Sequence, residues 1–324
     1  MSIESDRRPG SADRPGSAGR PGPAGRVPRR RRVSHNTRAG RVFDVLNVIF
    51  LLALAMVTVL PFGYVVAGSF AGEAEIASRG FFVWPHQFST AAYSAVFSTS
   101  TLLRSLIITV CVTLVGTLIH ITVTIMMAYP LAKRTLPGRR LLLNLIIFCM
   151  VFTGGLIPTY LVVKGLGLID SYWALILPAA VNPFYLMVVK SFFQELPPEL
   201  EESARLDGCT EVGILWRILL PLSKPVIATF SLFYAVALWN DFMSPLLYIN
   251  DSSKWTLQMF VRQVTTAAGT DTATALGNVD PSFVAPEQGI KFAVIVVATL
   301  PILVFYPFLQ KHFAKGVLIG SVKG

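Results

Sequence analysis

Six long apolar stretches constrain this chain more than any other feature of its sequence. Each holds about 20 or more predominantly apolar residues, the length that an α-helix needs to cross roughly 30 Å of hydrocarbon. Leaving surfaces of that size in water would cost several kcal/mol for each stretch. The stretches are 42–70, 105–129, 141–163, 172–193, 225–249 and 290–310. We therefore predict an all-α membrane protein with six transmembrane helices.

The placement of positive charge predicts the orientation of these helices. Lysine and arginine are enriched in the loops that stay in the cytoplasm. Here they are concentrated in the N-terminal segment, in loops 132–140 and 194–224, and after residue 310, whereas the alternate loops carry few. We therefore predict that both termini are cytoplasmic.

The N-terminal segment 1–41 accounts for most of the formal net charge of +10, because it holds eleven arginines against three acidic residues. It has no apolar set to bury, so we expect a disordered basic tail that lies along anionic lipid headgroups. No aromatic residues are interleaved with the arginines, which argues against a nucleic-acid partner. A cleaved signal sequence is disfavoured, since the apolar run that follows is about twice as long as a signal core.

The loop 194–224, after the fourth span, has a helical sequence pattern of its own. A proline and several acidic residues begin a predicted short helix over 198–207, and acidic residues there complement the positive end of the helix dipole. Gly208 suits the left-handed conformation that ends a helix. Thr210 is a good N-cap for a second helix that reaches Pro221.

A helix of about ten residues is marginal by itself in water, so we expect a partner to hold it. The alternative is an interfacial helix that rests on lipid. Its acidic residues, among them Glu202 and Asp207, argue against that alternative, because a membrane-surface helix normally presents lysine or arginine.

The segment Glu202-Ser203-Ala204-Arg205-Leu206-Asp207-Gly208, with Leu220-Pro221 at the end of the second helix, resembles the EAA loop of binding-protein-dependent ABC importer permeases. Ser203 stands where the family has alanine, and both residues are small. The resemblance covers most of residues 40–324 and is closest to the MalG-like carbohydrate permeases of the LplC/YtcP-like group. Further segments that carry it are 153–160, 170–175, 239–242 and 315–324.

The resemblance implies a type I ABC importer permease fold and a set of partners. These are a second permease subunit, two cytoplasmic ATPase subunits and an external solute-binding lipoprotein, in a bacterial plasma membrane. It implies a first span with its external loop over 42–104, a transport domain over 105–310 and a cytoplasmic tail over 311–324. The last external loop, 250–289, would contact the binding protein.

The same resemblance implies two groups of residues that contact the ATPase. The coupling loop would supply Glu202, Ser203, Ala204, Asp207, Gly208, Leu220 and Pro221. Glu202 would pair with a base on the ATPase, and Ala204 would permit close approach. The C-terminal tail would contribute Gly320, Ser321, Val322, Lys323 and Gly324.

Polar groups inside a membrane are costly and are candidates for the solute path. In the predicted fifth span, Trp239, Asn240 and Asp241 offer an aromatic face and hydrogen-bonding groups of the kind that bind sugars. Because neighbouring helical positions point in different directions, at most two of them face one cavity. Asp241 as a cap or a subunit contact is an equally good reading.

The predicted fourth span adds Asn182 and Tyr185 as candidates for the solute path. Lys190 on the same span is expected to extend to the cytoplasmic edge. The lone His120 is expected to be packed and hydrogen-bonded.

Two other classes of protein compete with the importer permease. An ion-coupled secondary transporter usually shows paired repeats and several ionisable groups at the membrane midplane, but this chain offers Asp241 alone. An intramembrane enzyme would need a catalytic grouping, and none of the common metalloprotease or hydrolase motifs occurs. We predict no cofactor, no metal site and no enzymatic activity. ATP would be hydrolysed by another chain.

Overall fold

The computed structural model describes residues 38–267 and 287–321 of the chain. Within them every regular element is a helix, apart from one isolated antiparallel bridge between Ala71 and Phe88. The predicted all-α class is therefore confirmed. The chain divides into two units, Met1–Met56 and Val57–Gly324.

The described part of the first unit belongs to helix α1 (Arg38–Ser69), which begins within the segment predicted to be disordered. The rest of that segment lies outside the described residues. Between Arg41 and Val59 the residues of α1 are exposed, although most are large and apolar. A helix that is apolar on all sides is typical of a membrane span.

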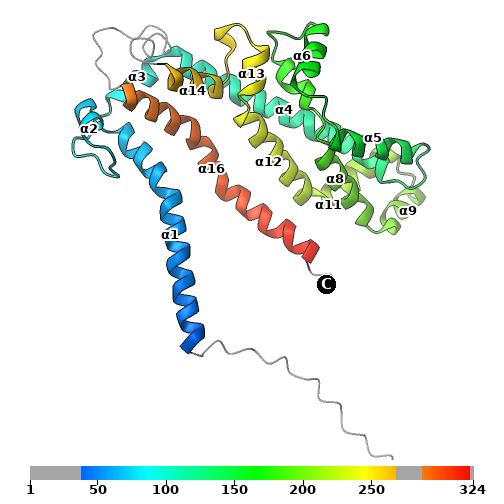
Figure 1. The fold of residues 1–324 in the computed structure, drawn as a ribbon. Coiled ribbons are helices and arrows are strands. Elements are labelled where there is room, and N and C mark those ends of the chain that lie inside the picture. The colour runs from blue at the N-terminus through cyan, green and yellow to red at the C-terminus, as the bar shows by residue number, and fades with distance from the viewer. Residues whose placement is uncertain (1–37, 268–286, 322–324) are drawn as a thin grey trace, which may run out of the picture. The chain divides into compact units, whose positions relative to one another are not determined.

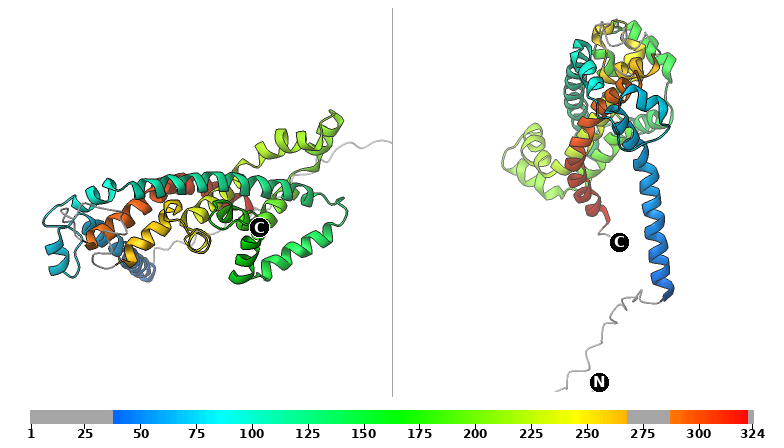
Figure 2. Two further views of the ribbon diagram at one scale, coloured as in Figure 1. Left: turned by 90° about the horizontal axis from the view of Figure 1, so that it is seen from above. Right: turned by 90° about the vertical axis from the view of Figure 1, so that its left-hand side faces the viewer.

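Three helices in the described residues are long and apolar enough to cross a membrane, and they span Gly40–Ser69, Ser100–Ala132 and Glu287–Val304. The second of these is α4 (Ser100–Ala132), and the third lies in α16 (Glu287–Ser321). Helix α12 (Lys224–Asn240) packs against both α4 and α16 (Figures 1 and 2).

Three further candidates are pairs of helices bent at a short break. The bend is 117° between Arg139–Val151 and Leu156–Gly165, 54° between Trp173–Ala179 and Pro183–Glu195, and 85° between Glu211–Leu222 and Lys224–Asn240. The described residues therefore contain three straight candidate spans, or up to six if each bent pair is one span. The predicted count of six transmembrane helices is the upper end of this range.

Local sequence explains two of these bends. Between α5 (Arg139–Val151) and α6 (Leu156–Gly165), Gly155 has a φ of +79°, a left-handed conformation that a glycine adopts without steric cost. Before α8 (Pro183–Glu195), the proline at the first helical position disfavours a helical conformation for Asn182. Asn182 instead caps α8, because its Oδ1 accepts hydrogen bonds from the amides of Phe184 and Tyr185.

The predicted fifth span, 225–249, is wrong as a single helix. Helix α12 ends at Asn240, and a separate short helix, α13 (Met243–Tyr248), follows. Asp241 accepts hydrogen bonds at Oδ1 from the amides of Met243 and Ser244, both at 3.1 Å. The Asp241 carboxylate therefore caps the start of α13, in agreement with the interpretation of Asp241 as a helix cap.

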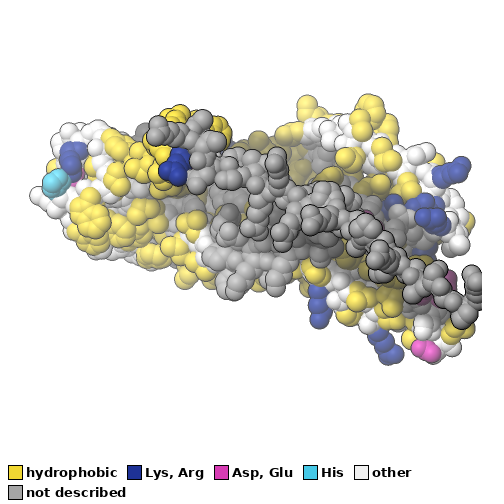
Figure 3. All heavy atoms as spheres, turned by 90° about the horizontal axis from the view of Figure 1, so that it is seen from below, with side chains coloured by type: hydrophobic (Ala, Val, Ile, Leu, Met, Phe, Trp, Pro, Cys, Tyr) yellow, Lys and Arg dark blue, Asp and Glu magenta, His cyan; other side chains and the backbone are white. Residues whose placement is uncertain are grey.

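The remaining helices are short and connect or cover the long ones. They are α2 (Glu73–Ser78), α3 (Ala91–Ser98), α7 (Trp173–Ile176), η1 (Leu177–Ala179), α9 (Pro198–Leu206), α10 (Glu211–Ile214), the π-helix η2 (Leu215–Leu219), α11 (Leu220–Leu222), η3 (Ser252–Lys254) and α14 (Leu257–Thr266). The largest buried cluster joins α4, α8, α9, α10 and α12. Figure 3 shows hydrophobic side chains that remain at the surface of one face, as hydrocarbon would allow.

Candidate coupling site

Helix α9 has the boundaries that the sequence predicts. It begins at Pro198 with acidic residues in its first turn and ends at Leu206. Gly208 has a φ of +79°, and its amide donates a hydrogen bond to the carbonyl of Arg205 at 3.0 Å. The amide of Cys209 donates to the carbonyl of Ala204 at 2.9 Å, which completes a Schellman motif. The glycine therefore ends the helix and reverses the chain, as predicted.

The second helical segment also begins where predicted. The Thr210 hydroxyl oxygen accepts a hydrogen bond from the amide of Gly213 at 3.2 Å and so caps α10. The chain continues through the π-helix and α11 as far as Leu222, and then bends at Ser223 into α12. The loop thus presents two short helices joined at a glycine.

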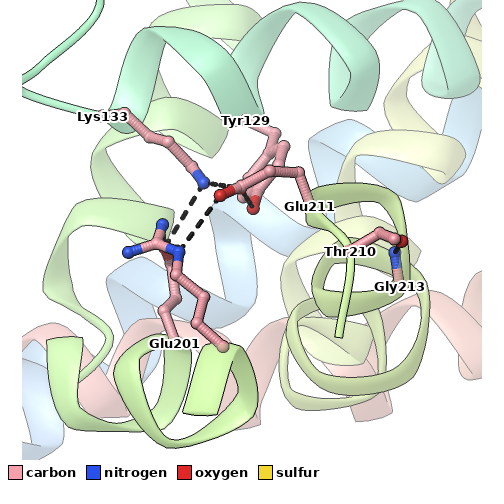
Figure 4. A network of polar contacts seen from close by, with 7 residues as sticks. Tyr129, Lys133, Glu201, Thr210, Glu211 and Gly213 are labelled. Carbon is pink, nitrogen blue, oxygen red and sulfur yellow. Dashed lines mark hydrogen bonds and ion pairs between the residues drawn. The ribbon is translucent and has the colours of Figure 1, made fainter. Parts of the chain in front are cut away.

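A network of charged groups ties these two helices to the end of α4 (Figure 4). Glu211 accepts a hydrogen bond from the Tyr129 hydroxyl at 2.6 Å and forms an ion pair with Lys133. Arg205 donates from Nε to Glu211 at 3.1 Å and from a terminal nitrogen to Glu201 at 3.1 Å. Lys133 also lies 3.5 Å from Glu201 and 4.3 Å from the centre of the Tyr129 ring.

Two carboxylates and two cations therefore balance one another where loop 132–140 meets loop 194–224. The hydrogen bonds from Lys133 and Tyr129 lower the pKa of Glu211 to about 2. The Glu211 side chain is 53% exposed, so solvent screens part of this interaction. The sequence alone does not reveal the network, because Lys133 and Glu211 are 78 residues apart and no spacing rule joins them.

The remaining side chains of α9 separate into an inner and an outer set. Ala204 is 4% exposed and belongs to the largest buried cluster, so it lets α9 approach the core of its own chain. The predicted contact of Ala204 with the ATPase stays a prediction. Glu202, Ser203 and Asp207 are exposed, and Leu206 is 90% exposed.

The second half of the loop continues the exposed surface. Val212 and Trp216 are exposed large hydrophobic residues, and Pro221 is exposed as well. Leu220 is half-buried against the largest cluster. We call Glu202, Leu206, Asp207, Val212 and Trp216 the loop ridge. No salt bridge among the described residues involves either acid of the ridge.

The candidates for the solute path do not form one cluster. Trp239 packs against the cluster that contains part of α16, and its indole nitrogen donates to the carbonyl of Ala298 at 3.4 Å. The Asn240 side chain is exposed and donates to the carbonyl of Val236 at 2.9 Å. Asp241 is a helix cap, as is Asn182. Trp239, Asp241 and Asn182 therefore have a structural role.

Tyr185 belongs to a different group. It is half-buried in an aromatic cluster with Phe230, Phe233 and Tyr234, at centroid distances of 5.0, 5.8 and 5.0 Å. His120 is 1% exposed, and its Nε2 lies 2.8 Å from the carbonyl oxygen of Ile176. The prediction that His120 is packed and hydrogen-bonded is confirmed.

A second polar junction lies at the start of the predicted last external loop. Asp170 accepts hydrogen bonds from the amides of Asn250 and Asp251 and forms an ion pair of 2.6 Å with Lys254. The hydrogen bond from Lys254 contributes most to lowering the pKa of Asp170 below its ordinary value, and the two amide hydrogen bonds add to it. The junction therefore fixes 250–254 onto the turn before α7.

The C-terminal tail is helical as far as the structure describes it. Helix α16 continues through Gly320 and ends at Ser321, beyond the predicted end of the sixth span at residue 310. Val322, Lys323 and Gly324 lie outside the described residues, as does most of loop 250–289 after Ala267.

Long apolar helices, bent apolar helix pairs and a capped, exposed loop joined to the bundle are typical of a membrane transport subunit. The chain belongs to the family of binding-protein-dependent transport system inner membrane components, whose model matches residues 113–319. It is thus a multi-pass inner membrane protein of an ABC importer rather than an enzyme. The alternatives of a secondary transporter and an intramembrane enzyme are set aside.

Two curated relatives from Bacillus subtilis (strain 168) are similar over nearly their whole length. Protein LplC is 64% identical over 290 residues, which cover 90% of this chain and 98% of the relative. The polygalacturonan/rhamnogalacturonan transport system permease protein YtcP is 52% identical over 286 residues, with 88% and 99% covered. The predicted resemblance to this group is confirmed.

A solved structure supports the fold. The chain matches a crystal structure of a bacterial ABC transporter involved in the import of the acidic polysaccharide alginate, with a TM-score of 0.80 and 27% identity. The match covers 86% of this chain and 98% of that chain.

Proposed function

We propose that this chain is the permease subunit of an importer that carries an oligosaccharide inward, with the loop ridge as the surface that receives the motion of a cytoplasmic ATPase. The partners in this proposal are a second permease subunit, two ATPase subunits and an external solute-binding lipoprotein. Both termini are proposed to be cytoplasmic. Six crossings are proposed, in which 139–165 and 173–195 each cross once as a bent pair, and α12 crosses without 211–222, which stays in the cytoplasmic loop.

One observation carries the proposal: Leu206, 90% exposed, stands between two exposed acidic residues on a helix that is held rigidly from behind. With the exposed Val212 and Trp216 of the same loop, Leu206 offers apolar surface rimmed by charge, of the kind that marks contact sites for other proteins. Glu202 and Asp207 supply charges to which a base on the partner can bind. The network around Glu211 would pass a displacement of α9 directly to α4.

The rigid backing distinguishes this ridge from an interfacial helix. Helix α9 is joined to α4 through Lys133 and to the core through Ala204, so its orientation is set by the protein and not by a lipid surface. Its outward acidic residues would also be repelled by anionic lipid. We propose that Gly208 and the adjoining turn keep the backbone close to the partner.

The proposed solute is a carbohydrate, because YtcP is named for polygalacturonan and rhamnogalacturonan transport and the solved importer for alginate. Both names describe acidic polysaccharides, so uronic-acid oligosaccharides are the first solutes to test. Of the residues considered for the path, Asn240 and Tyr185 remain candidates for contact, since one is exposed and the other presents an aromatic face.

The test is transport by the complete complex in proteoliposomes with its binding protein and oligogalacturonate. Leu206→Ser and Glu202→Lys should abolish uptake and reduce the amount of ATPase that copurifies. Membrane insertion and thermal stability should stay normal, because surface substitutions change stability by less than about 0.5 kcal/mol. Glu195→Lys, at the exposed end of α8, is the matched control and should transport normally. Normal uptake by the double variant Glu202→Lys, Leu206→Ser would refute the proposal.

A further inference from the structure

An open apolar cavity lies between α4, α5 and α8, at the end of the bundle that carries the loop network. Its volume is about 580 Å³, within the range of roughly 300–1,000 Å³ that is typical of ligand pockets. The lining residues are all apolar and include Met126, Leu131, Leu142, Leu145, Cys149 and Leu186.

Two cations stand within one helical turn of this lining. Arg139 begins α5, three residues before Leu142, and its Nε donates a hydrogen bond to the carbonyl oxygen of Leu131 at 2.9 Å. Lys190 follows Leu186 by four residues on α8, so both side chains lie on the same face of that helix. Helices α5 and α8 contact each other, which brings the two cations to one region of the cavity rim.

The stem of Lys190 is largely enclosed by the protein, because the residue as a whole is only 8% exposed. Enclosure by the protein is the main effect that disfavours its charge, and the neighbouring cation Arg139 adds a smaller one. Neither residue takes part in a salt bridge among the described residues.

Burying a charge is costly unless an opposite charge or hydrogen bonds compensate it, and a like charge nearby adds to the cost. An anion between Arg139 and Lys190 would remove both penalties. The exposed Arg134 and Arg140 belong to the same loop region and raise the local positive potential further.

We propose that this cavity binds an anionic phospholipid, with one acyl chain in the apolar groove and the phosphate between Arg139 and Lys190. The acyl chain by itself confers little preference, because leaving the surrounding lipid tails for the groove yields no hydrophobic gain. The headgroup charge therefore determines selectivity. This inference requires that the helices lie in a membrane, and it does not depend on which solute is transported.

The test uses the complete transporter purified with its partner subunits and native mass spectrometry with two lipids of identical acyl chains. Wild-type complex should hold phosphatidylglycerol at least about tenfold more tightly than phosphatidylcholine, because both lipids offer a phosphate but the quaternary ammonium of phosphatidylcholine would stand near two cations. Lys190→Met should remove this preference. The matched control Lys164→Met, at an exposed lysine on α6, should retain it.

A second measurement locates the bound lipid and does not depend on the folding of Lys190→Met. Phosphatidylglycerol should slow the alkylation of Cys149, which lines the cavity, and leave that of the exposed Cys111 on α4 unchanged. Leu145→Trp should fill the groove and abolish this protection.

Several outcomes would overturn the proposal. These are equal binding of both lipids by the wild type, a retained preference in Lys190→Met, and protection of Cys149 by inorganic phosphate alone. Crosslinking of Cys149 to the second permease subunit in the intact complex would show that protein covers the groove, and would overturn it as well.

Discussion

Glu211→Gln is the most informative substitution in the loop network. Glu211 joins Lys133 and Tyr129, from the end of α4, to Arg205 of α9, and glutamine has nearly the same shape without the charge. The substitution therefore removes ion pairing and leaves packing intact. We expect α9 and α10 to remain helical but to open more often.

The pKa of Glu211 gives the size of the effect. Its fall from 4.5 to about 2 corresponds to roughly 3 kcal/mol of interaction if no screening acted. Because the side chain is 53% exposed, the interaction energy that remains after solvent screening is about 1–2 kcal/mol. Such a loss changes an opening equilibrium by a factor of roughly 5–30. The backbone amides of Gly208 and Cys209, which close the end of α9, should exchange faster by that factor.

The pH dependence follows from the direction of the shift. A carboxyl group whose pKa is lowered on folding stabilises the fold above its unfolded pKa, here 4.5, and loses that contribution as the pH falls toward the folded value of about 2. The difference in exchange between wild type and Glu211→Gln should therefore be full at pH 7 and shrink below about pH 4.5.

The assay is hydrogen–deuterium exchange of the purified complex, read on peptides that cover 198–214. Glu202→Gln is the matched control, since Glu202 lies on the same loop but points outward. It should leave exchange unchanged. If Glu211→Gln exchanges like wild type, or if Glu202→Gln accelerates exchange equally, the network does not hold the loop.

Three further predictions concern single residues, and a fourth concerns the N-terminal segment. Gly208→Val should destabilise the turn by about 1–2 kcal/mol because its φ is +79°, and Gly208→Asn should cost less, as thermal unfolding would show. Asp241→Ala should lower the free energy of unfolding by about 1 kcal/mol, because it removes a helix cap. Asp241→Asn keeps the acceptor and should be near wild type in stability. If Asp241→Asn alters solute affinity, Asp241 belongs to the solute path after all. Asp170→Ala should weaken the stimulation of ATP hydrolysis by the binding protein and leave basal hydrolysis unchanged, unless 250–254 is held by other contacts. Deleting residues 1–30 should leave uptake nearly unchanged, and complete loss with normal insertion would contradict the assignment of that segment as a tail.

Local sequence signals predicted the coupling loop well, for a physical reason. Helix α9, its glycine end and the Thr210 cap depend on interactions between residues fewer than six positions apart. Proline at a first turn, glycine at a left-handed position and threonine at a cap act through the backbone at that place, so their effect can be read in order along the chain.

The spans were predicted less accurately, because apolar composition measures length in the membrane but not straightness. Gly155 and the Asn182-Pro183 pair bend two of the predicted spans, and Asp241 ends the predicted fifth helix early. A hydropathy average does not change at such a break, because the residues stay apolar. The break itself is tolerated where neighbouring groups form hydrogen bonds with the backbone N–H and C=O groups that the helix no longer pairs.

The sequence by itself determined the chemical class of this chain: where it is apolar, where it is basic, and where a short capped helix stands in a loop. Only the tertiary structure decided which acidic residues of that loop face inward, because Lys133 and Tyr129 reach Glu211 from α4 across about 80 positions. Only it showed that most of Lys190 is enclosed on α8, which contacts the helix that Arg139 begins. Burial and charge pairing depend on distance in space, and that distance is set when separate helices pack.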